Sequence, residues 1–354
     1  MNTESYLDAP VYSWKSDDKQ DFLQRELIAL TQYHIEHCQP YRQLIQQGKY
    51  TGNLTSTATI PPISVKLFKE LELKSIMKSE VFKQLNSSGT TGTPSKIYLS
   101  AVNAKLQSQI LVKLMQSWLG KSRRPMLLID SPTTIKKAGE MTARAAGLQG
   151  FSIFGRNHTY ALDENMQLDL QAVSEFFEQY SHQPVLIFGF TFMVWQRFIQ
   201  ALQKTCTEFE CDDAILIHGG GWKKLQNHAI SSENFKLTIR AQLGNVAVHD
   251  YYGMVEQTGT IYMECEQGHL HCPVWSDILI RNPADMSLCR HHQIGLIQVN
   301  SVLAQSYPGH CLLTEDLGEI LGEDNCPCGR NGKYFRVHGR VPQAEVRGCS
   351  DTFA

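Results

Sequence analysis

The sequence predicts a layered α/β fold with a smaller β-rich subdomain, and three observations carry this prediction. Over residues 101–253, apolar runs typical of buried strands alternate with amphipathic segments, which is the pattern of parallel βαβ units. From about residue 260 the pattern changes to short strands and turns. The chain has 354 residues, 42% of them hydrophobic and 19% charged, which is enough to bury a sizeable core.

The N-terminal part is expected to be helical. Its apolar periodicity predicts helices that break near Pro40 and end at Gly48. A proline-marked turn then leads into a short helix. We therefore expect residues 1–75 to form an N-terminal helical part.

The central part, residues 76–259, is expected to form an α/β core that contains the ligand-binding site. Helices and strands alternate along it, and strands joined in this way pair in parallel. The expected helices are 101–119, 136–150, 168–181, 192–204 and 223–228, with one more before the last strand, and the expected strands are 125–130, 184–190, 213–221 and 246–253.

The remainder of the chain divides into a β-rich part, 260–340, and a C-terminal tail, 341–354. The short strands that we expect in the β-rich part fall within 259–265, 269–280, 295–302 and 309–320. The tail carries Cys349, close to the end of the chain.

Composition excludes several classes of function. The net charge is -2 and no basic stripe is present, which argues against nucleic acid as a partner. No apolar run is long enough to span a bilayer, and the N-terminus lacks the features of a signal peptide. Ten cysteines without a secretion signal indicate reduced thiols in the cytoplasm, where metal or catalytic roles are expected before disulfides.

The stretch "SSGTTGTPS", residues 87–95, has the composition of a phosphate-binding loop. Glycines allow the backbone N–H groups to approach an anion, and the serine and threonine hydroxyls add further donors. The spacing does not fit the Walker pattern of a P-loop. Taken alone, a stretch of this kind is more often a flexible surface turn.

Four further motifs follow in order: "HGGGW" (218–222), "DYYGMVEQTG" (250–259), "TEDLG" (314–318) and "HGRVPQAEVRG" (338–348). Together with the 87–95 loop they resemble the signatures of the adenylate-forming superfamily of acyl- and aryl-CoA ligases, luciferase and peptide-synthetase adenylation domains. The resemblance covers most of the chain. It implies the large-domain core of these enzymes, whereas their mobile C-terminal domain, which supplies a catalytic lysine, is missing.

The resemblance also implies a role for each motif residue in binding ATP with Mg²⁺. Tyr252, followed by Gly253, would stack on adenine, and Asp316 would accept hydrogen bonds from the ribose. Glu256 would hold Mg²⁺, and Arg340 would contact the ribose or the α-phosphate. The residues implied to surround the phosphates and the adenine edge are Ser87, Ser88, Thr90, Thr91 and Gly92, with Gly220 and Gly221.

Two positions depart from the superfamily pattern. The lysine that usually follows the proline of the loop is Ser95, with Lys96 adjacent, and the threonine before the motif glutamate is Val255. The residue that replaces the charge of the missing catalytic lysine is left open among four candidates: Lys66, Lys69, Lys96 and Lys223.

The short motifs "GGGWK" and "YGMVEQ", together with a cysteine close to the C-terminus, resemble the sequences of acyl-protein synthetases of the LuxE type. This resemblance implies that a fatty acid is activated as acyl-AMP and transferred to Cys349 as a thioester, for delivery to a partner such as an acyl reductase or a carrier protein. Three alternatives stay open: an incidental Cys349, release of the acyl group to CoA or a carrier-protein thiol, and a non-catalytic scaffold that binds nucleotide or acyl-AMP.

A structural Zn²⁺ site is also expected. Cys265 and His271 flank a turn, and Cys326 and Cys328 follow some fifty residues later, a set that suits tetrahedral zinc. Phenylacetate-CoA ligases have a similar arrangement. His269 and Cys272 are competing ligands, and the alternative is a group of buried free thiols.

The sequence also predicts a pocket for the acyl chain. The run "FGFTFMVW" follows an expected strand and carries Phe188, Phe190, Phe192 and Trp195. In the superfamily such a strand end borders the acyl pocket, although aromatic residues at this density also form ordinary cores.

Overall fold

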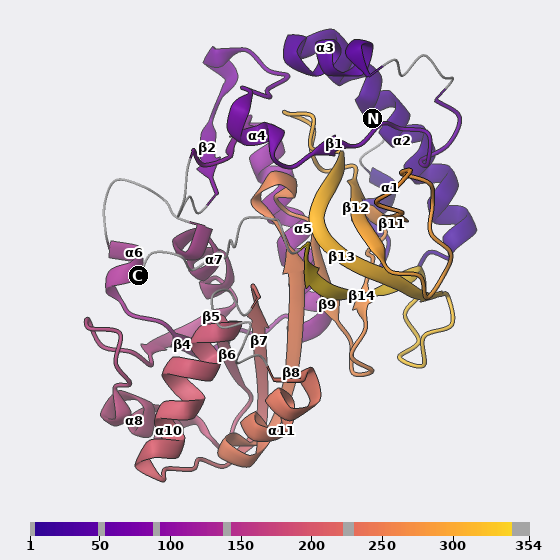
Figure 1. The fold of residues 1–354 in the computed structure, drawn as a ribbon. Coiled ribbons are helices and arrows are strands. Elements are labelled where there is room, and N and C mark those ends of the chain that lie inside the picture. Colours follow the sequence, from indigo (N-terminus) through magenta and orange to yellow (C-terminus); the bar gives the residue numbers. More distant parts are fainter. Residues whose placement is uncertain (1–3, 49–53, 88–92, 137–142, 222–229, 342–354) are drawn as a thin grey trace. The chain divides into compact units, whose positions relative to one another are not determined.

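The computed structural model describes residues 4–48, 54–87, 93–136, 143–221 and 230–341 (Figure 1). These residues fall into two compact units, which are described separately. Unit 1 comprises Met1–Ser117 and Tyr252–Glu345, and unit 2 is built from Trp118–Tyr251. The four-part division expected from the sequence stays a prediction.

Unit 2 is a parallel α/β layer, so the predicted fold class is confirmed. Its strands follow the order β5-β4-β6-β7-β8, and every pair is parallel. They are β4 (Arg124–Ile129), β5 (Gly155–Tyr160), β6 (Val185–Phe190), β7 (Cys211–Gly219) and β8 (Gly244–Gly253). The central strands are apolar runs without alternation because helices cover both faces of a parallel sheet.

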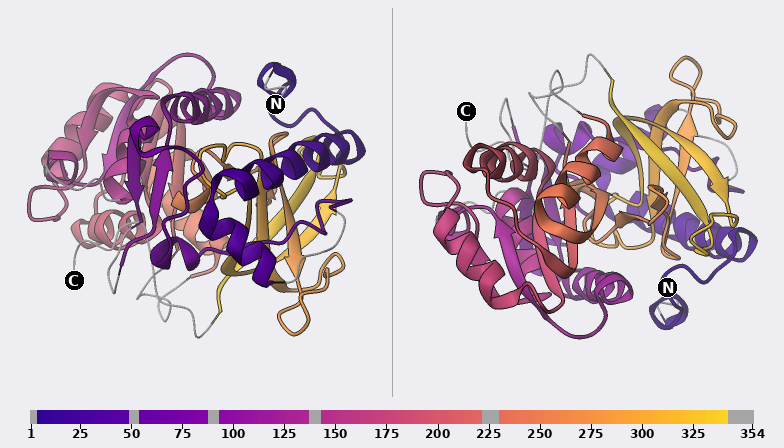
Figure 2. Two further views of the ribbon diagram at one scale, coloured as in Figure 1. Left: turned by 90° about the horizontal axis from the view of Figure 1, so that it is seen from above. Right: turned by 90° about the horizontal axis from the view of Figure 1, so that it is seen from below.

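The helices of unit 2 connect these strands. They are α6 (Thr133–Lys136), α7 (Ala143–Ser152), α8 (Leu170–Tyr180), α9 (Thr191–Met193), α10 (Gln200–Thr205) and α11 (Ser232–Leu243). The chain steps outward from β4 to β5 and then back past β4 to β6. Right-handed crossovers therefore place α7 on one face of the sheet, and α8, α10 and α11 on the other (Figures 1 and 2).

Unit 2 differs from the sequence expectation in two places. Strand β5 was not expected, because as an edge strand with polar, exposed residues at Arg156, Asn157 and His158 it lacks the apolar signal of its neighbours. The expected helix 192–204 is present but contains a π-helical turn, η2 (Val194–Ile199), between α9 and α10. The expected helix 223–228 lies outside the described residues.

The helices of unit 1 agree with the sequence expectation, except that the short first helix was not expected. They are α1 (Glu4–Asp8), α2 (Ser16–His37), α3 (Gln39–Gln47), α4 (Leu67–Glu70) and α5 (Ala101–Leu119), with a 3₁₀ turn η1 (Lys78–Glu80). The break between α2 and α3 falls at Cys38, and Pro40 occupies the first turn of α3, where its missing N–H costs no helical bond. Gly48 caps α3, and Gly120 follows α5 with a φ of +75°.

The strands of unit 1 form the β-rich part. An antiparallel sheet runs in the order β11-β12-β13-β14-β10-β9, and the short β1 joins β13 in parallel. The strands are β1 (Ile63–Ser64), β9 (Ile261–Glu264), β10 (Leu270–His271), β11 (Ser276–Arg281), β12 (Gly295–Ser301), β13 (Cys311–Glu323) and β14 (Lys333–Arg340). The expected strand 269–280 is two strands, with Pro273 between them because proline cannot donate to a ladder.

A separate hairpin, β2 (Lys83–Asn86) with β3 (Lys96–Leu99), flanks the loop 87–95. Its inward side chains join the core of unit 1, which also contains Tyr262, Tyr307 and Phe335. Among the described residues, no helix combines the length and apolar character needed to cross a bilayer.

Candidate functional site

Three of the motif residues meet within unit 1. The Tyr252 hydroxyl donates to Asp316 Oδ2 at 2.7 Å, and Arg340 Nε lies 3.4 Å from Asp316 Oδ1. Asp316 and Arg340 are direct partners across β13 and β14, so the strand register itself brings them together. The residues come from three separate motifs, and the structure places them around one carboxylate.

The surroundings of Asp316 explain its electrostatics. Burial raises the pKa of this carboxyl group, and the Tyr252 hydrogen bond and the Arg340 charge oppose that rise. The backbone N–H of Asp316 donates to the Thr314 hydroxyl at 3.1 Å, which restrains the backbone of β13 at this position. Each carboxylate oxygen has two lone pairs, so Asp316 can accept further hydrogen bonds from a ligand.

Glu256 lies on the 3₁₀ turn η4 (Val255–Gln257) and is buried. The Ser95 hydroxyl donates to Glu256 Oε1 at 2.7 Å. Ser95 is in turn held by Ser87, whose hydroxyl accepts from the Ser95 backbone N–H at 2.8 Å. Val255, where the superfamily pattern has a threonine, packs against the core of unit 1.

These contacts place Glu256 at the base of the 87–95 loop. Of the predicted phosphate-binding residues, Ser87 is described by the structure. Ser88, Thr90, Thr91 and Gly92 lie outside the described residues, as do Cys349 and Lys223.

The glycines of "HGGGW" follow β7 in unit 2. Gly220 has a φ of +74°, a conformation that favours glycine, and a side chain there would approach Phe190. A Cβ on the preceding Gly219 would overlap the Tyr251 ring. In the described part of the chain, no atom lies within 4 Å of a Cβ built on Gly221. The turn therefore requires glycine at two adjacent positions, for conformation and for space.

His218, just before these glycines, is a feature that the sequence did not single out. Its Nδ1 lies 3.0 Å from the Thr191 hydroxyl, whereas its buried Nε2 has no hydrogen-bond partner among the described residues. Burial lowers the pKa of His218 to about 3, with a smaller contribution from Lys236, so the imidazole is neutral. The Phe235 ring lies 4.8 Å from the imidazole, and Asp250 Oδ1 lies 3.5 Å from Nδ1.

Of the expected acyl-pocket aromatics, Phe188 and Phe190 are packed in the core, whereas Phe192 and Trp195 are half-buried. Phe188 and Phe190 point to the same face of β6 and are buried. Phe151 of α7 stacks on Phe188 with ring centroids 4.2 Å apart. Trp195 lies on the π-helical turn, 6.0 Å from Phe235. A role of these residues in binding an acyl chain stays a prediction.

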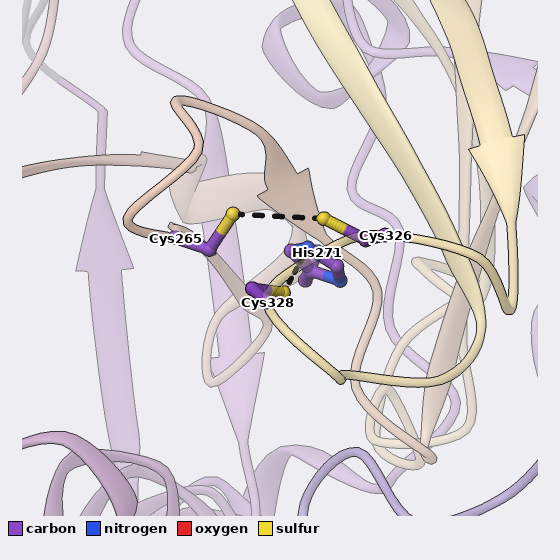
Figure 3. Close-up of side chains that lie close together, drawn as sticks. All are labelled: Cys265, His271, Cys326 and Cys328. Atoms are coloured by element: carbon purple, nitrogen blue, oxygen red, sulfur yellow. Dashed lines mark hydrogen bonds between the residues drawn. The ribbon is translucent and has the colours of Figure 1, made fainter.

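The four expected metal ligands converge in unit 1 (Figure 3). One ligand atom from each of Cys265, His271, Cys326 and Cys328 lies within 4.8 Å of all the others. Cys265 Sγ and Cys326 Sγ are 3.9 Å apart, and Cys328 Sγ lies 3.3 Å from His271 Nε2. Tetrahedral zinc places S···S at about 3.8 Å and S···N at about 3.5 Å. The donor set and its spacing therefore fit Zn²⁺.

The local fold prepares this cluster. Cys265 follows β9, and its sulfur accepts the Gln267 backbone N–H at 3.4 Å. Burial lowers the pKa of His271 to about 3, which keeps the imidazole neutral, as a metal ligand must be. Burial raises the pKa of the Cys328 thiol, but hydrogen bonds with Arg330, Cys326 and Cys265 together outweigh this and leave the pKa lowered.

The two competing ligands are less suitable. Cys272 follows His271 directly, so its side chain faces the opposite side of the strand, where it belongs to the core of unit 1. His269 Nδ1 lies 3.4 Å from Cys326 Sγ, and its ring stacks on Tyr334 at 4.8 Å. His269 thus borders the cluster without belonging to the mutually close set of four.

Of the lysines considered as substitutes for the catalytic lysine, Lys66 has a defined partner in unit 1. Its Nζ lies 2.9 Å from Glu315 Oε1, next to Asp316. Lys96 is exposed and lies on the opposite side of β3 from Ser95.

Comparison with known proteins identifies the family. The acyl-protein synthetase (LuxE) family model matches residues 3–354. The long-chain-fatty-acid–luciferin-component ligase of Aliivibrio fischeri is 22% identical over 350 residues, covering 96% of this chain and 90% of that protein. Its counterpart from Vibrio harveyi is 21% identical, covering 95% of this chain and 88% of that protein.

Solved structures show a similar fold. 2-Hydroxyisobutyryl-CoA ligase, in the postadenylation state with 2-HIB-AMP, has a TM-score of 0.71 and 15% sequence identity, covering 94% of this chain and 71% of that one. Its open conformation, with 2-HIB-AMP and CoA, has a TM-score of 0.70 and covers 95% of this chain and 79% of that one. At this identity the likeness establishes the fold alone.

Proposed function

The chain belongs to the acyl-protein synthetase (LuxE) family and is a ligase, and we propose that it activates a fatty acid as acyl-AMP at the expense of ATP. The fatty acid is proposed from the names of the two curated relatives. The proposal rests mainly on one observation. Tyr252 and Arg340 both contact the carboxylate of Asp316, and the three residues come from three separate motifs.

In the first half-reaction a carboxylate oxygen of the acid attacks the α-phosphorus of ATP. The new O–P bond gives acyl-AMP, and pyrophosphate leaves with the electrons of the broken bond. Negative charge grows on the phosphate oxygens, so catalysis depends on donors and cations placed in advance. We assign the ribose hydroxyls to Asp316, the adenine ring to Tyr252, Gly253, Gly220 and Gly221, and the ribose or α-phosphate to Arg340.

The residues fit a Mg²⁺ ion that accompanies ATP, because Glu256 offers a carboxylate at the base of the 87–95 loop. A bound Mg²⁺ would neutralise charge on the phosphates as pyrophosphate leaves. Within the loop, the hydroxyls and N–H groups of Ser87, Ser88, Thr90, Thr91 and Gly92 are proposed to hold the β- and γ-phosphates.

In the second half-reaction a thiolate attacks the acyl carbonyl carbon, a thioester forms and AMP leaves. We propose Cys349 as this thiol and a partner protein, such as an acyl reductase or a carrier protein, as the final acceptor. The main alternative is direct transfer to CoA or to a carrier-protein thiol. A third is a non-catalytic scaffold. A cytoplasmic location remains the expectation from the cysteine content.

Intact-protein mass spectrometry distinguishes these proposals. After incubation with ATP, Mg²⁺ and tetradecanoic acid, we expect an acyl adduct that hydroxylamine removes and that is lost in Cys349→Ser. The variant Cys206→Ser is the matched control, since Cys206 is exposed and belongs to none of the motifs, and it should retain the adduct. Pyrophosphate release without an adduct would move the acceptor to an outside thiol. Neither signal from folded protein would favour the scaffold.

We also propose that Cys265, His271, Cys326 and Cys328 hold a structural Zn²⁺ ion. Three thiolates and one imidazole complete a tetrahedral set with no position open for substrate, so the ion is assigned to folding rather than to catalysis. The purified protein should contain about one zinc per chain by elemental analysis. A content well below that would remove the site.

A further inference from the structure

We infer that the Ser95 hydroxyl positions the Glu256 carboxylate for the cation that accompanies ATP, an inference that rests on the adenylating function proposed above. Ser95 occupies the place where the superfamily pattern has a lysine. The sequence alone suggests that a function has been lost at this position. The geometry points to a replacement with a different physical role.

The contact itself is short and shielded from water. Ser95 has no exposed surface, and Glu256 is 7% exposed. The Ser95 Oγ–H donates to Glu256 Oε1 at 2.7 Å. A hydrogen bond to a carboxylate is stronger than a neutral one, and burial removes the competing water, so this bond fixes the direction of the carboxylate.

The backbone makes Ser95 a rigid anchor for that bond. β2 and β3 pair in antiparallel register with Asn86 opposite Lys96, and Ser87 and Ser95 lie directly outside this last pair in the sequence. The Ser87 N–H donates to the Ser95 carbonyl at 3.0 Å, and the Ser95 N–H donates to the Ser87 hydroxyl at 2.8 Å. The bond to Glu256 therefore ties the closed base of the 87–95 loop to a residue far away in sequence.

Side-chain alternation excludes Lys96 from this place. Ser95 and Ile97 face the interior, so Lys96 between them points to the opposite side of the hairpin. Its charge acts instead on Glu72, whose pKa it helps to lower after the larger effect of Lys74. Lys96 therefore does not substitute for the missing lysine at position 95.

The choice of serine has a consequence for cation binding. A lysine ammonium at position 95 would compete with a divalent cation for the Glu256 carboxylate. A hydroxyl orients the same carboxylate and adds no charge of its own, so it does not compete with a hard cation for that group. We therefore expect Mg²⁺ to increase the affinity for ATP, and we expect the size of this increase to depend on the Ser95 hydroxyl.

Calorimetric titration of ATP, with Mg²⁺ and then with EDTA and without any acid substrate, tests this inference. We expect the wild type to bind ATP more tightly with Mg²⁺. In Ser95→Ala that gain should shrink about tenfold, which corresponds to about 1.4 kcal/mol. Ser95→Thr keeps the hydroxyl and should keep most of the gain. Ser95→Cys, a weaker donor of similar size, should give an intermediate loss.

The matched control is Ser75→Ala. Ser75 is equally buried in unit 1 and donates or accepts one side-chain hydrogen bond, to His34 Nδ1 at 2.7 Å. Its loss should lower the urea midpoint but leave the Mg²⁺-dependent gain unchanged. If the wild type shows no such gain, the proposed nucleotide site fails. If the wild type shows it and both Ser95→Ala and Ser95→Cys keep it in full, the role of Ser95 is refuted while the function stands.

Discussion

Replacing His34 by glutamine should flatten the dependence of stability on acid pH. His34 and His310 lie in the interior of unit 1 with ring centroids 4.9 Å apart, and neither has exposed surface. His34 Nδ1 lies 2.7 Å from the Ser75 hydroxyl and its Nε2 3.1 Å from the Ala304 carbonyl, while His310 Nε2 lies 2.9 Å from the Thr31 hydroxyl. Both rings must therefore stay neutral in the folded state.

The magnitude follows from the pKa values. Burial lowers the pKa of His34 to about 3, and it lowers that of His310 well below the usual value. An unfolded histidine titrates near pH 6.5, so between about pH 6.5 and pH 3 the unfolded chain binds more protons than the folded one. Stability is therefore lost as the pH falls through this window. His34 alone should lower the free energy of unfolding by about 2 kcal/mol between pH 7 and pH 5.

The assay is urea unfolding, followed by circular dichroism, at pH 7 and at pH 5. The loss of unfolding free energy between these two pH values should be about 2 kcal/mol smaller in His34→Gln than in the wild type. The control is His182→Gln, because His182 lies on the surface with a side-chain exposure of 86% and should leave the loss unchanged. An equal loss in wild type and His34→Gln would refute the reasoning.

Three further predictions concern single contacts. Tyr252→Phe removes the hydroxyl that donates to Asp316 and should weaken ATP binding about tenfold in calorimetry; unchanged affinity would contradict the assigned contact. Cys326→Ser removes one of the four converging ligands and should abolish bound zinc in elemental analysis and lower the melting temperature, whereas retention of zinc would count against the assigned set. Arg144→Met leaves the buried Asp130 carboxylate unpaired in unit 2 and should cost about 3–5 kcal/mol of unfolding free energy, a cost under about 1 kcal/mol being incompatible with that pairing.

The parts of the fold that could be predicted from the sequence are those with a strong apolar signal. Strands β4 and β6 are buried on both faces, so their residues form uninterrupted apolar runs. Helix α5 has clear apolar periodicity and a glycine directly after its end, and its predicted bounds are confirmed. β5 escaped prediction because an exposed edge strand is rich in polar residues.

The candidate site shows a similar division. Motif order was sufficient to select Tyr252, Asp316 and Arg340, and the structure brings these three together. The role inferred for Ser95 depends on the direction of its side chain, just before β3, and on its distance from Glu256. Neither quantity is encoded in local sequence, since the two residues belong to separate motifs and meet only through tertiary packing.

The metal ligands illustrate the same limit. Cysteine and histidine spacing indicated a zinc site but left His269, His271 and Cys272 as alternatives. Strand alternation places Cys272 in the core, and the mutual distances single out His271. The choice among these ligands requires the structure, because successive residues of a strand point to opposite faces of the sheet.

The most direct test of the central claim is exchange between ATP and labelled pyrophosphate in the presence of a fatty acid. Exchange requires reversible formation of acyl-AMP and needs neither a thiol nor a partner protein. We predict exchange that depends on both tetradecanoic acid and Mg²⁺ and that falls strongly in Asp316→Asn. Absence of acid-dependent exchange across a series of fatty acids, in folded protein that contains its zinc, would contradict it.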